Sequence, residues 1–190
     1  MTYTSGSCSI APSHTRFPQD MVEQFSAITK QNLESCIIEA MKEDFPQISN
    51  ISILKDGDEP ALFATTKAPE TVKIPLTVVS SGASRYLGML LAVTATKNGV
   101  VLIDEIENGL YWKKMPNIWK RLRALCVQLG VQIFATTHSN ECLQSLVEAI
   151  EGHEEDFSLI RTVMEDGLHG VEHFYGKTFL AALRQHGEVR

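Results

Sequence analysis

The stretch from Val100 to Glu105 constrains the fold of this chain more than any other. Four apolar residues, Val100 to Ile103, end abruptly in two carboxylates, Asp104 and Glu105. A strand that is apolar on both faces is typical of the middle of a parallel sheet with helices on each side. We therefore expect an α/β fold with a mostly parallel central sheet. Its two acids should fall at the carboxyl edge, where open α/β sheets bind their ligands.

A pair of adjacent acids after a core strand fits the chemistry of a nucleotide hydrolase. The first carboxylate, Asp104, would hold a magnesium ion, and the second, Glu105, would orient and deprotonate an attacking water. The alternative interpretation is a buried strand that runs out into a charged surface loop. The choice between them depends on what else reaches the same edge.

Length, charge and composition narrow the class of protein. The chain has 190 residues, enough for one domain with a substantial core. Its net charge of −6 argues against a chain that coats nucleic acid or an anionic membrane. The cysteines form no C-x-x-C pair, and the histidines show no zinc-like spacing. No secretory signal is visible, and the longest apolar run is too short to cross a bilayer, so we expect a cytoplasmic protein without membrane partners.

The first half of the chain divides into a lead, a helical region and short strands. Residues 1–17 are predicted to be a flexible lead, and residues 18–190 the folded domain. A helical region begins at Pro18 and ends before Pro46. Residues 51–79 then predict a small β segment at one edge of the sheet, whose last extended piece contains a proline and therefore lies at an edge.

The second half predicts a strand that returns beside the first. A helix opened by Pro116 and closed by Gly130 is followed by the apolar run Val131–Thr137. If this strand lies parallel to Val100–Ile103, the helix between them makes a right-handed crossover, and His138 reaches the same edge as the two acids. A histidine there can contact a terminal phosphate or position the water. The alternative is a histidine that caps the next helix.

A third polar stretch, Ser80 to Arg85, precedes the apolar helix 86–96. Small hydroxyl residues and a glycine at a helix start leave backbone N–H groups that bind phosphate, with the helix dipole adding to the attraction. Arg85 could add a cationic fork. The alternative is plain N-capping, because serine and glycine are favoured there for the same geometric reason. The candidate nucleotide-binding residues are Ser80, Ser81, Gly82, Ser84 and Arg85.

The order S-S-G-x-S-R, V-V-L-I-D-E-x-E-N-G-L and F-A-T-T-H-S resembles the C-terminal half of the ABC-like ATPases of the AAA-type core domain group. This group includes the heads of the overcoming-lysogenization-defect (OLD) and related phage-defence ATPases. The resemblance covers residues 18–190 and implies a P-loop NTPase fold with ATP and Mg²⁺ as cofactors. It assigns the signature motif to Ser80–Arg85, the Walker B strand to Val100–Asp104, the catalytic glutamate to Glu105 and the switch histidine to His138.

The family's P-loop, G-x-x-x-x-G-K-[ST], is absent from this sequence. A near match occurs where Gly176-Lys177-Thr178 follows Gly170 with five intervening residues instead of four. The plainer interpretation of that region is a β-hairpin followed by a helix from Thr178. The resemblance therefore implies an ATP-hydrolysing subunit or fragment, which is an ATPase only if another chain supplies a P-loop half.

Two functions from different classes follow. In the first, a P-loop-containing half or a homologous subunit forms a dimer across the signature motif. Asp104 then positions magnesium through water, and Ser81, Gly82 and Ser84 act on the partner's nucleotide. In the second, the chain is a non-enzymatic interaction or dimerisation module in a phage-defence or DNA-associated complex, with a nuclease or toxin as partner and DNA reached through it. Micromolar binding of Mg-ATP by the purified chain separates the two.

Overall fold

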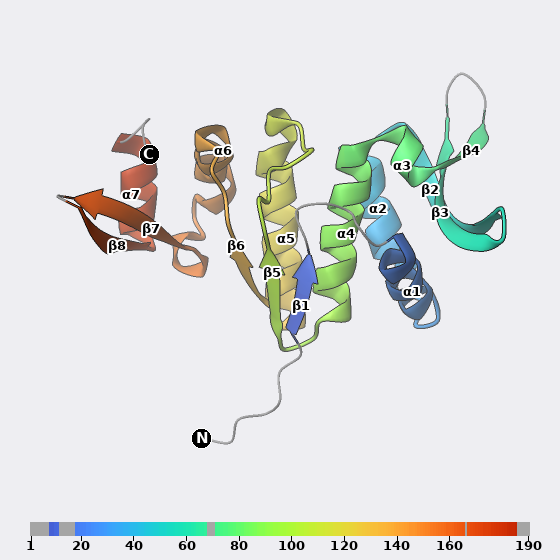
Figure 1. The fold of residues 1–190 in the computed structure, drawn as a ribbon, viewed down its shortest axis with the longest axis horizontal. Helices are drawn as coiled ribbons and strands as arrows, with labels where there is room; N and C mark the ends of the chain where they lie inside the picture. Colours follow the sequence, from blue (N-terminus) through green and yellow to red (C-terminus); the bar gives the residue numbers. More distant parts are fainter. Residues whose placement is uncertain (1–7, 12–17, 68–70, 166, 186–190) are drawn as a thin grey trace.

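The computed structural model describes residues 8–11, 18–67, 71–165 and 167–185. Within these ranges the chain forms a central parallel sheet, an antiparallel sheet at one end and a β-hairpin at the other, with helices packed between them (Figure 1). The described helices include none that is both long and apolar enough to cross a membrane.

The central sheet has the strand order β1-β5-β6, and both pairs are parallel. Its strands are β1 (Cys8–Ala11), β5 (Val100–Ile103) and β6 (Gln132–Ala135). Helix α5 (Met115–Leu129) connects β5 to β6 and ends at Gly130, whose φ of +66° is left-handed. The prediction that the strands before Asp104 and His138 are parallel neighbours is therefore confirmed.

Strand β1 lies inside the segment predicted to be a flexible lead. That prediction is wrong for Cys8–Ala11, which pairs with β5 in the register Cys8↔Val100 to Ala11↔Ile103. Four residues without a periodic pattern give no sequence signal, and this strand is ordered by its ladder to β5. The other residues of 1–17 lie outside the described ranges.

One face of the central sheet is covered and the other is open. Helix α4 (Ser81–Ala95) packs on β1 and β5, so that Val101 and Ile103 are buried in the core. On the opposite face Leu102 is 38% exposed and Phe134 is 49% exposed. The predicted parallel sheet with packed helices is confirmed, and in the described chain the face that carries Leu102 and Phe134 stays partly exposed. An apolar run indicates that a strand can be buried on both faces. It does not identify the element that covers each face.

The N-terminal region folds around a separate antiparallel sheet. Helices α1 (Pro18–Thr29) and α2 (Glu34–Asp44) precede strands β2 (Ile48–Asp56), β3 (Glu59–Thr66) and β4 (Val72–Pro75). These strands pair in the order β2-β3-β4, and no described ladder joins them to the parallel sheet. The edge position of β4 is confirmed. Residues 76–79, predicted to be extended, form the short helix α3 (Leu76–Val79) instead.

The C-terminal region forms a hairpin between two helices, as predicted. After η1 (Trp112–Lys114) and α5, helix α6 (Asn140–Ile150) leads through η2 (Glu154–Asp156) to β7 (Ser158–Glu165), β8 (Leu168–Tyr175) and α7 (Lys177–Gln185). The hydroxyl of Thr178 donates to the carbonyl of Tyr175 at 2.7 Å, closing the turn into α7. The Gly176-Lys177-Thr178 segment is thus the junction of a hairpin and a helix.

Candidate functional site

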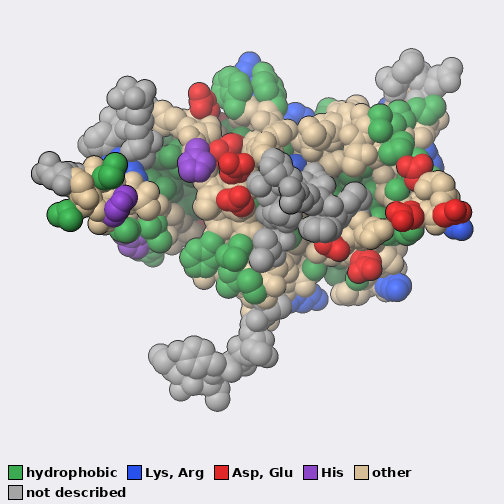
Figure 2. Space-filling view, in the orientation of Figure 1, with side chains coloured by type: hydrophobic (Ala, Val, Ile, Leu, Met, Phe, Trp, Pro, Cys, Tyr) green, Lys and Arg blue, Asp and Glu red, His purple; other side chains and the backbone are tan. Residues whose placement is uncertain are grey.

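The ends of β5 and β6 bring the predicted site residues to one edge. Beyond the sheet, the amide of Thr136 donates to the carbonyl of Ile103 at 2.9 Å, and the amide of Ile106 donates to the carbonyl of Thr136 at 3.1 Å. These bonds hold the segment after β5 against the segment after β6. On the face seen in Figure 2, acidic side chains gather beside a histidine, above an apolar patch.

Thr136 links both acids through one hydroxyl group. Its Oγ1 donates to Asp104 Oδ1 at 2.7 Å and accepts from the amide of Glu105 at 2.9 Å. A threonine hydroxyl has one proton to give and lone pairs to receive, so both bonds form together. Sequence analysis missed this residue, although its position directly before the T-H-S end of the strand run placed it at the edge. Thr136 fixes the direction of the Asp104 carboxylate and the start of the following turn.

Glu105 occupies a left-handed backbone conformation, with φ of +45°. Non-glycine residues rarely adopt this region, and such conformations gather at functional sites because surrounding contacts must hold them. Here the amide of Asn108 donates to the carbonyl of Glu105 at 2.9 Å, and its side-chain amide lies 3.5 Å from Glu105 Oε2. Glu105 is half-buried and is restrained by Asn108 of the same turn, whereas Asp104 is exposed.

Arg85 lies beneath this acidic turn. The side chain is only 5% exposed, and its Nη2 donates to the carbonyl of Asp104 at 2.6 Å and to that of Glu105 at 3.4 Å. Burial lowers the pKa of the guanidinium from its usual value, and the nearby acids Asp104, Glu105 and Glu107 oppose that shift. The sequence predicted a cationic fork open to phosphate. In the structure the guanidinium instead supports the backbone that carries the two acids.

The rest of the signature segment packs on the turn that follows the acids. The hydroxyl of Ser80 accepts from the amide of Ala83 at 3.2 Å, so Ser80 caps α4. A Cβ at Gly82 would lie 2.6 Å from the carbonyl oxygen of Gly109, a contact that only glycine permits. Ser81 is exposed, whereas Ser84 is buried. Of the five predicted residues, Ser80 and Ser81 retain accessible side chains.

His138 joins the edge through its backbone. Its amide donates to Glu107 Oε1 at 3.1 Å, and its side chain is exposed. The cap of α6 is the next residue, Ser139, whose hydroxyl accepts from the amide of Cys142 at 3.1 Å. The helix-capping role considered for His138 thus belongs to Ser139, and the imidazole remains exposed near the acids.

The oxygen donors at this edge fit a magnesium ion. Mg²⁺ prefers oxygen ligands, keeps several waters and is typically held by one or two carboxylates together with the phosphates of a nucleotide. The Asp104 carboxylate, oriented by Thr136, carries oxygen atoms of the kind that this ion prefers. Among the described residues, no three His, Cys, Asp or Glu side chains gather into a ready-made metal centre. The edge therefore suits magnesium that arrives with a nucleotide, while the P-loop donors for the phosphates are missing from the sequence.

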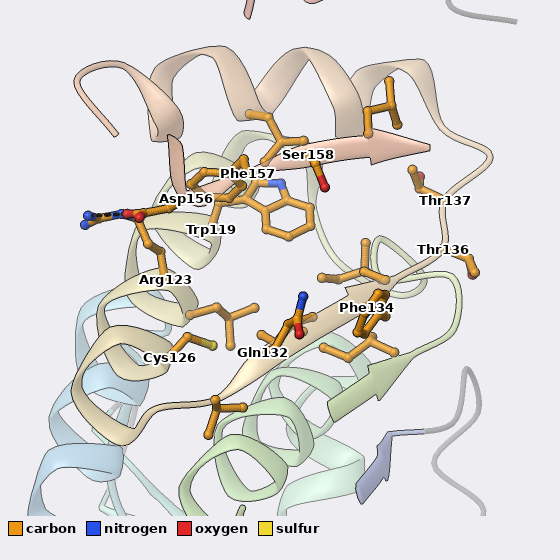
Figure 3. A pocket seen from close by; sticks show the side chains of 18 of the residues that line it. Trp119, Arg123, Cys126, Gln132, Phe134, Thr136, Thr137, Asp156, Phe157 and Ser158 are labelled. Carbon is orange, nitrogen blue, oxygen red and sulfur yellow. Dashed lines mark hydrogen bonds and ion pairs between the residues drawn. The ribbon is translucent and has the colours of Figure 1, made fainter. Parts of the chain in front are cut away.

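A cavity of about 870 Å³ opens beside the acidic edge, and we call it the trough (Figure 3). Asp104, Thr136 and Thr137 lie at its rim. Residues 130–137 of the β6 segment and residues 156–160 around the start of β7 line it from two sides. Helix α5 contributes further apolar side chains, which include Trp119, Leu122, Cys126 and Val127.

Comparisons with known proteins agree with this architecture. Residues 11–143 match a family described as "AAA domain, putative AbiEii toxin, Type IV TA system". An "ATP/GTP phosphatase" of Helicobacter pylori is 34% identical over 89 residues, which are 45% of this chain and 24% of that protein. The match thus spans about a quarter of the relative's length.

A solved structure supports the fold class. It comes from work on the "Structural biochemistry of ATP-driven dimerization and DNA stimulated activation of SMC ATPases" and has a TM-score of 0.50 at 13% identity. The similarity covers 88% of this chain and 99% of that chain. At this identity the likeness concerns the fold alone, and it confirms an α/β architecture with a parallel sheet flanked by helices, similar to the P-loop NTPase heads of that class.

Proposed function

This chain belongs to the AAA-domain family described as a putative AbiEii toxin of type IV toxin–antitoxin systems, and we propose that it supplies the hydrolytic edge of an ATPase. The family places the chain among ATPase-like domains of the AAA and ABC type. The observation that carries the finer proposal is the hydrogen-bonded set of Asp104, Glu105 and Thr136 at the carboxyl edge, with the exposed His138 beside it.

Each residue at this edge has a distinct proposed task. When bound, Mg²⁺ would neutralise charge on the phosphates and align them for attack. Asp104 would hold the ion, and Thr136 would keep that carboxylate in one orientation. Glu105, restrained by Asn108, would accept the proton of the attacking water as a general base. His138 would contact the terminal phosphate.

The proposed site is completed by a P-loop segment that this sequence does not contain. We assign it to a P-loop-containing half or a homologous subunit, which would face the start of α4 across a dimer. Ser80, Ser81 and Gly82 would then meet the nucleotide held by that partner. The buried Ser84 and Arg85 would support α4 and the acidic turn from within. The family description supports a toxin–antitoxin setting. Our proposal extends it to a phage-defence complex, in which a nuclease, toxin or DNA-bound partner reads out the ATPase cycle.

Substitution of the two acids tests the assignment in the complex with the P-loop-bearing polypeptide. Glu105→Gln should lower the hydrolysis rate by about 10²- to 10⁴-fold, because the amide keeps the shape but cannot take up a proton. The affinity for ATP should change little. Asp104→Asn should instead weaken the magnesium-dependent part of nucleotide binding.

The exposed Glu39 on α2 gives the matched control, since Glu39→Gln removes one carboxylate far along the chain from the edge. That variant should hydrolyse ATP like the wild-type chain. Near-normal turnover by Glu105→Gln would contradict the catalytic assignment. A wild-type complex that assembles but never hydrolyses ATP would favour the non-enzymatic interaction module.

A further inference from the structure

We propose that Glu107 is the positioning residue of His138. Its carboxylate holds the backbone of the turn after β6 against the turn that carries the two acids, so that the imidazole and the acids keep one arrangement. This inference rests on the proposed function, because it adds a residue to the same site and explains what holds the histidine there.

The contact takes the place of the next rung in the parallel ladder. Thr136 donates its amide to the carbonyl of Ile103 at 2.9 Å. In a parallel pair every second amide of a strand faces the same neighbour, so the amide of His138 is in phase with that of Thr136. The main chain after β5 has turned away at this point, through the left-handed Glu105. Glu107 Oε1 accepts the His138 amide instead, at 3.1 Å.

The turn from Thr137 to Ser139 needs such a tie. It belongs neither to β6, which ends at Ala135, nor to α6, which begins at Asn140. Thr137 lines the trough, so the turn borders open space on that side. The His138 side chain is exposed, so its place depends on the backbone that carries it. A bond to the His138 amide therefore determines where the imidazole lies.

Glu107 is itself held by the acidic turn and lies between two helices. Its carbonyl accepts from the amide of Leu110 at 2.9 Å, and its side chain is half-buried. Burial lowers the pKa of the Arg85 guanidinium on α4, and the charge of Glu107 helps to oppose that shift. Burial raises the pKa of the Cys142 thiol in the first turn of α6, and the same charge adds to the rise. The carboxylate thus joins the surroundings of α4, the acidic turn and α6.

Stability alone does not explain a carboxylate at this position. Glu107 Oε2 is buried, and no hydrogen bond from the described residues reaches it. A buried charged oxygen without a donor lowers stability. Asp104, Glu105 and Glu107 also gather around the guanidinium of Arg85, and like charges close together repel. Unfavourable charge of this kind is typical of functional sites.

The placement of the histidine matters for the proposed reaction. His138 would contact the terminal phosphate while Glu105 accepts the proton of the attacking water. A misplacement of about 1 Å can cost about 10²-fold in rate. Glu107 belongs to the same turn as Glu105 and bonds to the backbone of His138, so it keeps the two groups in register.

Amide hydrogen exchange of the full 190-residue chain, followed by NMR, tests the tie itself. Glu107→Ala removes the acceptor and should speed exchange of the His138 amide by about tenfold or more, as expected for the loss of a hydrogen bond to a charged group. Glu107→Gln keeps an acceptor oxygen and should leave the exchange rate near that of the wild type. The Thr136 amide, which bonds to the carbonyl of Ile103, should be unaffected by either variant.

ATP hydrolysis by the complex with the P-loop-bearing polypeptide tests the consequence. Glu107→Ala should lower kcat by about 10- to 100-fold and leave KM for ATP nearly unchanged, because the displaced histidine acts in the chemical step. Glu107→Gln should restore most of kcat. In a His138→Ala background, Glu107→Ala should have little further effect, because residues that act through one another are not additive.

Glu141 provides the matched control, three residues after His138 on α6. Its carboxylate accepts from the hydroxyl of Ser139 at 3.1 Å, whereas the His138 amide bonds to Glu107. Glu141→Ala therefore removes a nearby negative charge and leaves the tie in place. Both the exchange rate of the His138 amide and kcat should stay close to those of the wild type.

The possible outcomes separate this inference from the proposed function. Unchanged exchange of the His138 amide in Glu107→Ala overturns the inference. Faster exchange at Thr136 as well also overturns it, because Glu107 would then support the whole edge. Equal losses of kcat in the alanine and glutamine variants, or additive losses with His138→Ala, do the same. Near-normal turnover by Glu105→Gln would refute the catalytic assignment alone, since exchange in the free chain does not depend on hydrolysis.

Discussion

The hydroxyl of Thr136 lies 2.7 Å from Asp104 Oδ1 and 2.9 Å from the amide nitrogen of Glu105. One side chain at the end of β6 therefore holds both acids that follow β5. Because Ile103 pairs with Ala135, directly before these residues, the geometry of the edge depends on the parallel register of the two strands. This arrangement makes Thr136 a positioning residue in the proposed site.

Replacement of Thr136 by valine should impair hydrolysis, because valine keeps the shape and loses the hydroxyl. The Asp104 carboxylate would lose the bond that orients it. Partners that orient metal ligands are typically worth about 10- to 100-fold in metal affinity or activity. We expect a loss of this size for Thr136→Val in steady-state ATP hydrolysis by the complex, together with weaker Mn²⁺ binding.

Serine provides the matched control at this position. Thr136→Ser retains the hydroxyl and should restore most of both properties, which a purely steric role of the threonine methyl group would not allow. Equal activity of the valine and serine variants would show that the hydrogen bonds to the acids have no part in the chemistry.

Arg85 should prove to be a determinant of stability. Its buried guanidinium donates to the carbonyls of Asp104 and Glu105, so Arg85→Met leaves both without that donor. A hydrogen bond that involves a charged group typically contributes about 1.5–3 kcal/mol to stability. We expect Arg85→Met to lower the free energy of unfolding, measured with urea, by that order. Arg85→Lys should recover part of it.

The same Arg85 variants distinguish two roles of this side chain, support of the acidic turn and direct contact with phosphate. If Arg85 served phosphate, Arg85→Met would weaken ATP binding in the complex and leave the unfolding of the free chain nearly unchanged. The structure predicts the opposite result. Arg85→Met should destabilise the free chain, and any loss of ATP affinity in the complex should arise because the two acids are displaced.

The sequence was sufficient to predict the parallel pair and the position of Asp104, Glu105 and His138 at its carboxyl edge. The apolar run before Asp104, the crossover helix ending at Gly130 and the second run before His138 each follow from local pattern and chain chirality. The roles of Thr136 and Arg85 were missed because they depend on hydrogen bonds between residues 19 to 32 positions apart. No local pattern encodes such contacts.

Sequence pattern also could not predict which face of the central sheet is buried, and the reason is different. Val101 and Leu102 are both apolar, and periodicity gives them the same status, yet Val101 is fully buried while Leu102 is 38% exposed. Sequence pattern reports what a strand can bury. It does not report which element covers each face, as α4 does on the face of Val101.

Two glycines of helix α4 should respond to alanine in opposite directions. A Cβ at Gly82 would lie 2.6 Å from the backbone carbonyl oxygen of Gly109, so the helix start or the turn after the acids must shift. Overpacking of this kind costs about 1–3 kcal/mol. Gly82→Ala should therefore lower the free energy of unfolding by that order in chemical denaturation.

Gly88 is the matched control within the same helix. The nearest atom to a Cβ there is the sulfur of Met21 at 3.8 Å, an ordinary contact. Alanine is favoured over glycine in a helix interior by about 0.5–1 kcal/mol, so Gly88→Ala should stabilise the chain. Destabilisation of equal size by both substitutions would show that the Gly82–Gly109 contact has no special cost.

The buried thiols should make the fold less stable at alkaline pH. Burial raises the pKa of Cys126 to about 11 and that of Cys142 to about 12, from the usual 9.0. Above pH 9 the unfolded chain releases these protons while the folded chain keeps them until pH 11 or beyond. The unfolded state then binds fewer protons, so the free energy of unfolding falls as pH rises. Below pH 9 both states keep the protons, and these two groups add no pH dependence.

Urea unfolding at pH 8 and pH 10 measures this effect. The wild-type chain should lose stability between the two values, and the double variant Cys126→Ala and Cys142→Ala should lose less. The variant's lower absolute stability from the smaller side chains applies at both pH values and cancels in the comparison. The exposed thiols of Cys8 and Cys36 provide the control, since their replacement by alanine should leave the difference between pH 8 and pH 10 as it is in the wild type. A double variant with the full wild-type loss would assign the alkaline sensitivity to other groups.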